Sequence, residues 1–267
     1  MMTNNQYDRR FAGTKKLYGE TNFSHFENAH VYVIGVGGVG TWVAEGLART
    51  GVGEITLIDM DVLVASNVNR QLPAMDDNFG KSKIVAMAER ITQINPHVTL
   101  NLIDDFLTKD TVKALLPHRQ AVKDLQVLGK SVIILDCVDD MDAKLAIALH
   151  CRFNKLKLVT AGGAGGKTDP TKIAVSDLKD TFQDPLLAKL RQKLRQDFGI
   201  NRELKDKFGI KCVYSTQPPI IDKGEQQSNT QACQVGGLHC GGYGSAVAVT
   251  SVMAMVMVAE GLQMLSK

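Results

Sequence analysis

Six residues, Gly35-Val-Gly-Gly-Val-Gly40, constrain the fold of this chain more than any other feature. They match the pattern G-x-G-x-x-G and stand between an apolar run at 30–36, which predicts a buried strand, and a helical run at 39–50. A second predicted strand follows at 54–59. A strand, a glycine turn, a helix and a second strand form a parallel unit with a right-handed crossover, which predicts a doubly wound α/β sheet.

The glycines of this motif have distinct expected roles at a phosphate group. Gly35 permits the tight turn, Gly37 lets the backbone approach a phosphate, and Gly40 lets the helix pack closely on the strand; Gly38 belongs to the same turn. The amino end of the helix adds free N–H donors and a partial positive charge. Asp59, 19 residues beyond Gly40 at the end of a predicted strand, is placed to bind a ribose. The turn alone does not separate NAD from ATP.

The same alternation continues along the chain and then weakens. Further helices are predicted at 81–94 and 140–154, and further strands at 98–103, 131–135 and 157–160. After the glycine run 161–166 we expect a basic amphipathic helix at 186–198, a polar loop at 216–231 and an apolar helix at 245–265. We therefore predict a Rossmann-like, mostly parallel sheet with a C-terminal α/β elaboration. The expected organisation is one domain, 1–267, with a nucleotide-binding part at about 25–166 and a second part at about 167–267.

Composition allows this fold and locates an uneven charge. The 267 residues are 44% hydrophobic, enough for one large core, and 31 Lys and Arg against 28 Asp and Glu give a net charge of +3. Segment 186–211 holds eight basic and three acidic residues, so the rest of the chain has 23 basic and 25 acidic residues, a net of −2. The segment is either a solvated helix face or a surface for a polyanion.

Residues beyond Asp59 separate ATP from NAD. Segment 66–71 reads S-N-V-N-R-Q and segment 80–83 reads G-K-S-K. A dinucleotide dehydrogenase does not need an arginine and a lysine here, whereas nucleotidyl transfer does, because negative charge builds on the triphosphate as a carboxylate attacks the α-phosphorus. We expect Arg70 and Lys83 to neutralise that charge.

A further motif places carboxylates at the end of the strand 131–135. The sequence there is L-D-C-V-D-D at 135–140, and ligands bind at this edge of parallel sheets. Asp139 is the expected ligand of Mg²⁺, which prefers hard oxygen donors and bridges phosphates. Asp136 and Asp61 have the alternative of being turn-forming residues at strand ends.

Together these motifs resemble those of the ubiquitin-activating-like adenylating enzymes, which include the sulfur-carrier activators of thiamin and molybdopterin synthesis. The resemblance implies ATP bound with Mg²⁺, and it implies Asp139 as the metal-associated catalytic aspartate, assisted by Arg70 and Lys83. The implied ATP-binding residues are Gly35, Gly37, Gly38, Gly40, Asp59, Asp61, Asn67, Arg70, Gln71, Lys83 and Asp139.

Three departures point to one branch of that superfamily. No C-x-x-C pair is present, so we expect no structural zinc. Gly13 stands where the sulfur-carrier activators have an arginine that reaches the partner subunit's ATP, which leaves Arg9 or Arg10 as a substitute. The stretches 160–170, 183–186 and 211–216 resemble the tRNA threonylcarbamoyladenosine dehydratases.

That branch implies an ATP-dependent cyclisation of N6-threonylcarbamoyladenosine beside the tRNA anticodon, in a homodimer with a functional link to a cysteine desulfurase system. The basic helix would then contact tRNA through residues spread across its exposed side, namely Lys189, Arg191, Lys193 and Arg195. The alternatives are an activator of a ubiquitin-like or sulfur-carrier protein, and a nucleotide-binding scaffold without turnover.

Four smaller expectations complete the prediction. The five cysteines and the polar N-terminus indicate reduced thiols and a cytoplasmic location. Cys137 and Cys151 are expected in the core, while Cys212, Cys233 and Cys240 are candidates for a thioester cysteine, which an intramolecular cyclisation does not need. Carbonyl groups of 161–166 offer a place for a monovalent cation. The apolar stretch 245–265 is expected to be a buried helix at a subunit interface rather than a membrane anchor.

Overall fold

The structure is a computed structural model that describes residues 4–200, 206–220 and 243–266. Its strands are β1 (Ala29–Ile34), β2 (Glu54–Ile58), β3 (Thr99–Ile103), β4 (Ser131–Asp136), β5 (Lys157–Ala161), β6 (Ile173–Asp177) and β7 (Lys211–Ser215). Its α-helices are α1 (Asn4–Tyr18), α2 (Glu20–Glu27), α3 (Gly40–Thr50), α4 (Lys83–Ile94), α5 (Val112–Leu115), α6 (Arg119–Val127), α7 (Met141–Asn154), α8 (Pro185–Gln196) and α9 (Val247–Leu265).

The strands form one sheet in the order β3-β2-β1-β4-β5-β7-β6. Every neighbouring pair is parallel except β6 and β7, which are antiparallel. The order reverses between β1 and β4, so the loops that leave these two strands diverge at the carboxyl edge and open the place where doubly wound sheets bind ligands. The predicted fold class is confirmed.

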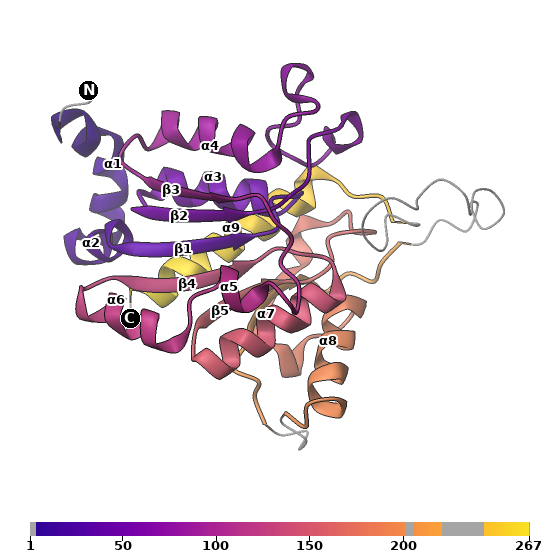
Figure 1. The fold of residues 1–267 in the computed structure, drawn as a ribbon. Helices are drawn as coiled ribbons and strands as arrows, with labels where there is room; N and C mark the ends of the chain where they lie inside the picture. The colour runs from indigo at the N-terminus through magenta and orange to yellow at the C-terminus, as the bar shows by residue number, and fades with distance from the viewer. Residues whose placement is uncertain (1–3, 201–205, 221–242, 267) are drawn as a thin grey trace.

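Helices cover both faces of the sheet (Figure 1). Val31 and Val33 of β1 point to the core beneath α3, α4 and α9, whereas Ile34 points to the core beneath α7 and α8. This alternation follows from the period of two along a strand, and a strand buried on both faces reads as a continuous apolar run. The run at 30–36 is such a strand.

Helix α9 is apolar because it lies across the sheet. It packs against α3 and against β4, β5 and β7, with Met253 and Met257 fully buried. Among the described residues, α9 is the one helix long and apolar enough to cross a membrane. A helix in the core of a soluble protein also meets this criterion of length and composition. Packing within the chain therefore accounts for the composition of 245–265.

Two strands, β6 and β7, and four helices, α1, α2, α5 and α6, were not predicted. Strands β6 and β7 have five residues each, and β6 is only partly buried along its length, so its side chains show no clear hydrophobic alternation. Helices α1 and α2 read as a polar N-terminus, yet they bury Phe11, Phe23 and Phe26 against the core of the α3 face. In these segments tertiary burial decides the structure more than local pattern does.

Candidate active site

The glycine turn has the geometry that its sequence predicts. Gly35 has φ 81°, and its N–H donates to the carbonyl of Ile58 on β2. A Cβ at Gly40 would lie 1.8 Å from the Gly35 carbonyl oxygen, so only glycine allows α3 to begin so close to β1. A Cβ at Gly37 would meet no atom within 4 Å. This open side of the turn is where a phosphate is able to approach the backbone.

The turn is closed on its other side by two distant segments. A Cβ at Gly38 would lie 3.2 Å from Arg70 Cγ and 3.3 Å from Thr250 Cγ2 of α9. The indole of Trp42 donates to the Arg70 carbonyl at 3.0 Å, and the N–H of Val247 donates to the Asn69 carbonyl at 3.0 Å. Segment 66–72 and the amino end of α9 thus meet at the glycine turn.

Asp59 directly follows β2 and is a buried carboxylate that faces the turn. Its Oδ2 accepts from the N–H of Val36 at 2.6 Å, and its Oδ1 accepts from the N–H of Asp61 at 2.9 Å. Burial raises the pKa of Asp59, and Lys83, with Nζ 4.0 Å from Oδ1, partly opposes that rise. Each carboxylate oxygen has a second lone pair, so hydrogen bonds to a ribose remain possible.

Lys83 and Asn67 hold the neighbouring loops in place. Lys83 begins α4, is 6% exposed, and donates to Asp61 Oδ2 at 2.7 Å. The buried side chain of Asn67 accepts a hydrogen bond from the N–H of Val64 at 3.1 Å. The backbone carbonyl of Asn67 accepts from the N–H groups of Arg70 and Gln71. Both predicted site residues therefore shape the loop that would contact the nucleotide.

Arg70 and Gln71 follow this turn with polar groups near the glycine loop. The Arg70 guanidinium donates to the Ser66 carbonyl at 2.8 Å and to Asn69 Oδ1 at 2.9 Å, bonds at the surface that a triphosphate is able to replace. Gln71 Oε1 is buried and accepts no hydrogen bond within the described ranges. A buried unpaired acceptor is costly in a folded chain, and this one lies where a ligand is expected.

Asp139 lies in the loop that follows β4, and β4 pairs with β1, the strand that leads into the glycine turn. Ile34 of β1 pairs with Asp136 of β4, and the Cβ position of Gly35 is 3.1 Å from the backbone of Val138. Asp139 itself is exposed. No three His, Cys, Asp or Glu side chains of residues 4–200, 206–220 and 243–266 are grouped to hold a metal. Mg²⁺ is commonly held by one or two carboxylates with substrate phosphates and water, and a single exposed carboxylate beside a phosphate turn fits that donor set.

A buried ion pair beneath Asp139 fixes the end of β4. Lys144 of α7 is 0% exposed and donates to Asp136 Oδ2 at 2.7 Å and to Thr160 Oγ1 at 2.9 Å. Asp136 Oδ1 accepts from the N–H of Val138 at 3.0 Å. Asp136 is therefore a structural residue that shapes the loop to Asp139. The sequence signal for it was a lysine directly before the apolar run 145–149 of α7.

The four basic residues predicted to contact tRNA lie on α8 but do not share one side. Successive positions two apart are separated by about 200° around a helix, so Lys189 and Lys193 lie together and Arg191 and Arg195 lie together, beside the buried leucines. Lys189 is exposed, and Lys193 pairs with Asp142 at 3.5 Å.

The two arginines turn inward. Arg191 donates to the carbonyls of Leu178 and Thr181, each at 3.0 Å. The Arg195 guanidinium lies 5.2 Å from the ring centroid of Phe208, and its Nε is buried with no hydrogen bond within the described part of the chain. The expectation that all four spread across the exposed side is therefore wrong for Arg191 and Arg195.

The cysteines that the structure describes are unsuited to a thioester. Cys151 is buried in α7, as expected, and Cys212 is fully buried in β7. Cys137 is partly exposed beside the glycine turn, where core burial was predicted. Burial raises the pKa of all three thiols, which disfavours the thiolate that would act as a nucleophile. Cys233 and Cys240 lie outside the described residues.

Arg10 has a structural role in this chain. Its guanidinium donates to the carbonyls of Gln93 and Ile94 at 2.6 and 2.8 Å, at the carboxyl end of α4. Arg9 is exposed and forms no ion pair with any residue that the structure describes. Of the two candidates for a partner-reaching arginine, Arg9 is therefore the one available.

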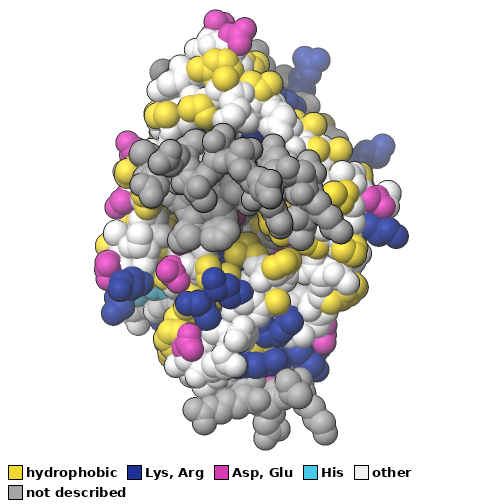
Figure 2. Space-filling view, turned by 90° about the vertical axis from the view of Figure 1, so that its right-hand side faces the viewer, with side chains coloured by type: hydrophobic (Ala, Val, Ile, Leu, Met, Phe, Trp, Pro, Cys, Tyr) yellow, Lys and Arg dark blue, Asp and Glu magenta, His cyan; other side chains and the backbone are white. Residues whose placement is uncertain are grey.

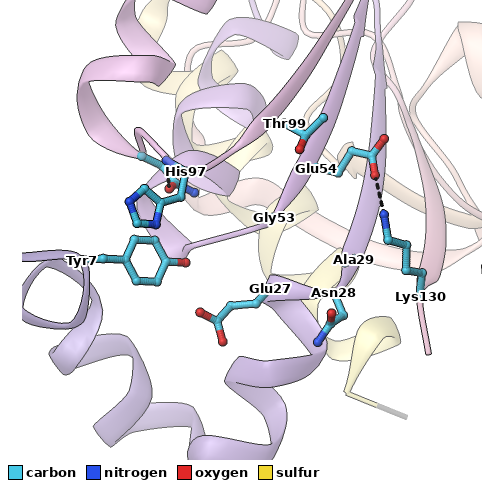
Figure 3. A pocket seen from close by; sticks show the side chains of 10 residues that line it. Tyr7, Glu27, Asn28, Ala29, Gly53, Glu54, His97, Thr99 and Lys130 are labelled. Atoms are coloured by element: carbon cyan, nitrogen blue, oxygen red, sulfur yellow. Dashed lines mark hydrogen bonds and ion pairs between the residues drawn. The ribbon is translucent and has the colours of Figure 1, made fainter. Parts of the chain in front are cut away.

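A separate cavity lies at the amino edge of the sheet, across the molecule from the glycine turn. Its volume is about 330 Å³, and it is lined by the starts of β1, β2 and β3. Tyr7 and His97 stack there with centroids 4.7 Å apart, and Glu54 pairs with Lys130 at 3.2 Å (Figure 3). None of the predicted site residues lines this cavity, so the candidate active site is the carboxyl edge alone.

The carboxyl edge has the elements of a nucleotide-binding site in a doubly wound sheet: an open glycine turn at a helix start, a carboxylate for the ribose, and basic side chains nearby. The chain belongs to the ThiF family, whose model matches residues 7–267.

Its relatives include two bacterial enzymes. The tRNA threonylcarbamoyladenosine dehydratase of Escherichia coli is 44% identical over 259 residues, covering 96% of this chain and 92% of the relative. The enzyme of that name from Haemophilus influenzae is 42% identical over 262 residues, covering 98% and 95%. The crystal structure of the E. coli enzyme in complex with ATP has a TM-score of 0.81 to this chain at 42% identity, covering 99% of this chain and 96% of that one.

Proposed function

We propose that this chain is an ATP-dependent tRNA-modifying cyclodehydratase that acts on N6-threonylcarbamoyladenosine beside the anticodon. The observation that carries the proposal is the likeness to the E. coli enzyme over nearly the whole chain, in sequence and in a structure that holds ATP. The open glycine turn and the buried Asp59 of this chain supply the corresponding nucleotide site.

The reaction has two covalent steps. A carboxylate oxygen of the threonyl group attacks the α-phosphorus of ATP, the bond to pyrophosphate breaks, and an acyl adenylate forms. A carbamoyl oxygen or nitrogen then attacks the activated carbonyl, the carbamoyl group releases one proton to solvent, and the ring closes. AMP leaves with the carboxylate oxygen, so the substrate loses the elements of one water. The acyl adenylate is needed because hydroxide is a poor leaving group and AMP is a good one.

The residues of the site divide this work. Asp59 binds the ribose, the N–H groups of residues 35–40 bind phosphate, and Arg70 and Lys83 offset the charge that builds on the triphosphate. Asp139, with the phosphates, would hold Mg²⁺, which supplies further charge neutralisation at those oxygens. Arg70 and Lys83 exchange their present partners, Ser66 and Asp61, for phosphate oxygens.

Contact with tRNA is proposed through two lysines of α8, Lys189, which is exposed, and Lys193, which is partly exposed. Lys189 and Lys193 face away from the buried leucines of that helix, and Lys193 keeps one weak ion pair. Figure 2 shows Lys and Arg side chains gathered on the lower half of this face of the molecule, where α8 lies. A polyanion is attracted to such a surface.

Several further parts of the proposal follow from the resemblance. We expect a homodimer, and exposed apolar side chains on the segment that leads from β2 to α4, including Met60, Val68 and Met75, offer a surface for a second copy. Sedimentation at several concentrations tests the dimer. We also propose a monovalent cation at 161–166, which a dependence of turnover on K⁺ would test. Copurification from cells tests the proposed link to a cysteine desulfurase system. Cell fractionation tests the proposed cytoplasmic location.

Pyrophosphate release tests the main proposal. Purified protein, ATP and Mg²⁺ are mixed with tRNA that carries the threonylcarbamoyl group or lacks it, and we expect release only with the modified tRNA. Release that is independent of the modification contradicts the proposal. Release that requires a carrier protein ending in Gly-Gly would favour the activator of a ubiquitin-like protein, an alternative that these relatives do not support.

A further inference from the structure

Residues 181–184 form a turn that exposes an aromatic ring near the carboxyl edge of the sheet. Phe182 is 55% exposed. Its ring meets that of Tyr214 on β7 in a T-shaped contact, with centroids 5.9 Å apart and an interplanar angle of 81°. Tyr214 is 2% exposed, so the Phe182 ring has a fixed support on one side while more than half of its side chain stays accessible.

The backbone beside this ring adopts an unfavourable conformation. Gln183 has φ 56°, one of two non-glycine residues with positive φ among those described. A residue with a Cβ is rarely stable there unless its surroundings hold it, and such positions gather at functional sites. The turn is therefore maintained by its neighbours and not by local preference.

Three charged side chains hold the turn. Arg191 donates to the carbonyl of Thr181 at 3.0 Å and to its Oγ1 at 2.7 Å. Lys167, 3% exposed, donates to the carbonyl of Gln183 at 3.0 Å. Asp184, also 3% exposed, accepts from the N–H of Gly163 at 2.9 Å. A turn clamped at each end presents Phe182 in a preorganised position, which lowers the entropy cost of binding.

The clamped turn lies on the same edge as the reaction. Gly163, which anchors Asp184, lies two residues beyond the end of β5. Thr160 of β5 pairs with Asp136 of β4, the strand that leads to Asp139. Helix α8 begins at Pro185 and carries Lys189 one turn further on. The exposed ring therefore stands between the nucleotide site and the proposed tRNA surface.

We propose that Phe182 is a stacking platform for an unpaired base of the RNA loop that carries the modified adenosine. Sequence-tolerant recognition of single-stranded RNA commonly uses an aromatic face beside cationic residues. A single ring flanked by the polar Asp180 and Gln183 matches one base in size, whereas a protein interface needs a larger apolar patch. The inference rests on the proposed function, because that function supplies the RNA.

The test measures binding of an anticodon stem-loop RNA in which each unpaired loop base is replaced in turn by the fluorescent base 2-aminopurine. Wild type is expected to quench one position through stacking. Phe182→Ala should abolish this quench and weaken binding about ten-fold. Phe182→Trp should retain the quench and the wild-type affinity. The slope of log affinity against log salt should not change, because no charge is removed.

Two variants control for a structural effect. Phe182→Leu keeps an apolar contact with Tyr214 without a π face, and is expected to bind ATP and melt like wild type while losing the quench. Phe153→Ala removes a Phe that is 71% exposed near the end of α7 and should change nothing. Wild-type quench and affinity in Phe182→Ala overturn the inference. Loss of ATP binding, or a change from dimer to monomer, in Phe182→Leu also overturns it.

The proposed function fails separately. If wild type releases no pyrophosphate with modified tRNA, the function is wrong whatever Phe182 does. If wild type does release pyrophosphate, and Phe182→Ala has the wild-type kcat/KM for that tRNA, only the stacking inference is wrong.

Discussion

The carboxyl edge of the sheet differs between two regions. Beyond β1 and β4, some polar side chains have no hydrogen-bond partner among the described residues, whereas beyond β5 and β7 the charged side chains form hydrogen bonds with backbone groups. Asp139 is exposed and Gln71 Oε1 accepts no hydrogen bond from the described residues. Lys167, Asp184 and Arg191, by contrast, each hold backbone groups of the turn at 181–184 or of its neighbour Gly163. The comparison teaches that the first region keeps some polar groups free for a ligand, whereas in the second region the charged side chains hold the turn that presents Phe182.

The sharpest test of the first region is Asp139→Ala. Pyrophosphate release should fall at least about a hundred-fold, because charge on the triphosphate loses its counterpart during transfer. Thermal unfolding should not change, since the side chain is exposed. Asp110→Ala, another exposed aspartate, is the control and should keep full activity. Release at the wild-type rate in Asp139→Ala would show that this carboxylate is dispensable.

Within the glycine turn, we expect Gly40 to be needed for the fold and Gly37 to be needed for ATP binding. Gly40→Ala places a Cβ on the Gly35 carbonyl and should lower the free energy of unfolding by about 2 kcal/mol. Gly37→Ala adds a Cβ in open space, so unfolding should change by less than about 0.5 kcal/mol. ATP affinity of Gly37→Ala should fall about ten-fold, as for one lost hydrogen bond. Urea unfolding measures the free energy of unfolding, and ATP titration measures the affinity. Equal effects of the two variants on both quantities would contradict these separate roles of Gly40 and Gly37.

On α8, in the second region, Arg191 is expected to stabilise the fold and Lys189 to bind tRNA, and substitutions of the two residues test this difference. Arg191→Met removes hydrogen bonds to Leu178 and Thr181 and should lower the free energy of unfolding by about 1.5 kcal/mol. Lys189→Ala should leave stability unchanged and reduce the salt slope of tRNA binding by about one. An unchanged slope in Lys189→Ala would mean that α8 does not contact the RNA backbone through this residue.

The smallest expected effect concerns the pH dependence of Asp59. Burial raises its pKa above the ordinary 3.8, so the folded chain holds this proton more tightly than the unfolded chain does. Its contribution to stability therefore falls as pH rises through the window above 3.8. Asp59→Asn does not titrate, so without ATP its stability relative to wild type should be higher at about pH 7 than at about pH 4. A difference that is independent of pH would contradict this assignment, and urea unfolding at both values measures it.

Sequence reasoning predicted the first region better than the second. The positions of Gly35, Gly40 and Asp59 follow from spacing within one strand-turn-helix-strand unit. The structure has both glycines in their expected geometry and places the Asp59 carboxylate beside the turn. The basic helix was also predicted, but its four cations were treated as one exposed group. Helical periodicity alone would have separated Lys189 from Arg191, and this signal was missed.

By itself, the sequence determined the doubly wound sheet, the glycine turn and the carboxylate that faces it, because those residues interact with neighbours in one continuous unit. Tertiary structure alone decided which charged groups stay exposed and which hold the fold. The hydrogen bond from Gly163 to Asp184 spans 21 positions, and that from Lys167 to Gln217 spans 50. A lysine or arginine has the same charge in either place, so its role depends on which backbone groups the folded chain brings within reach.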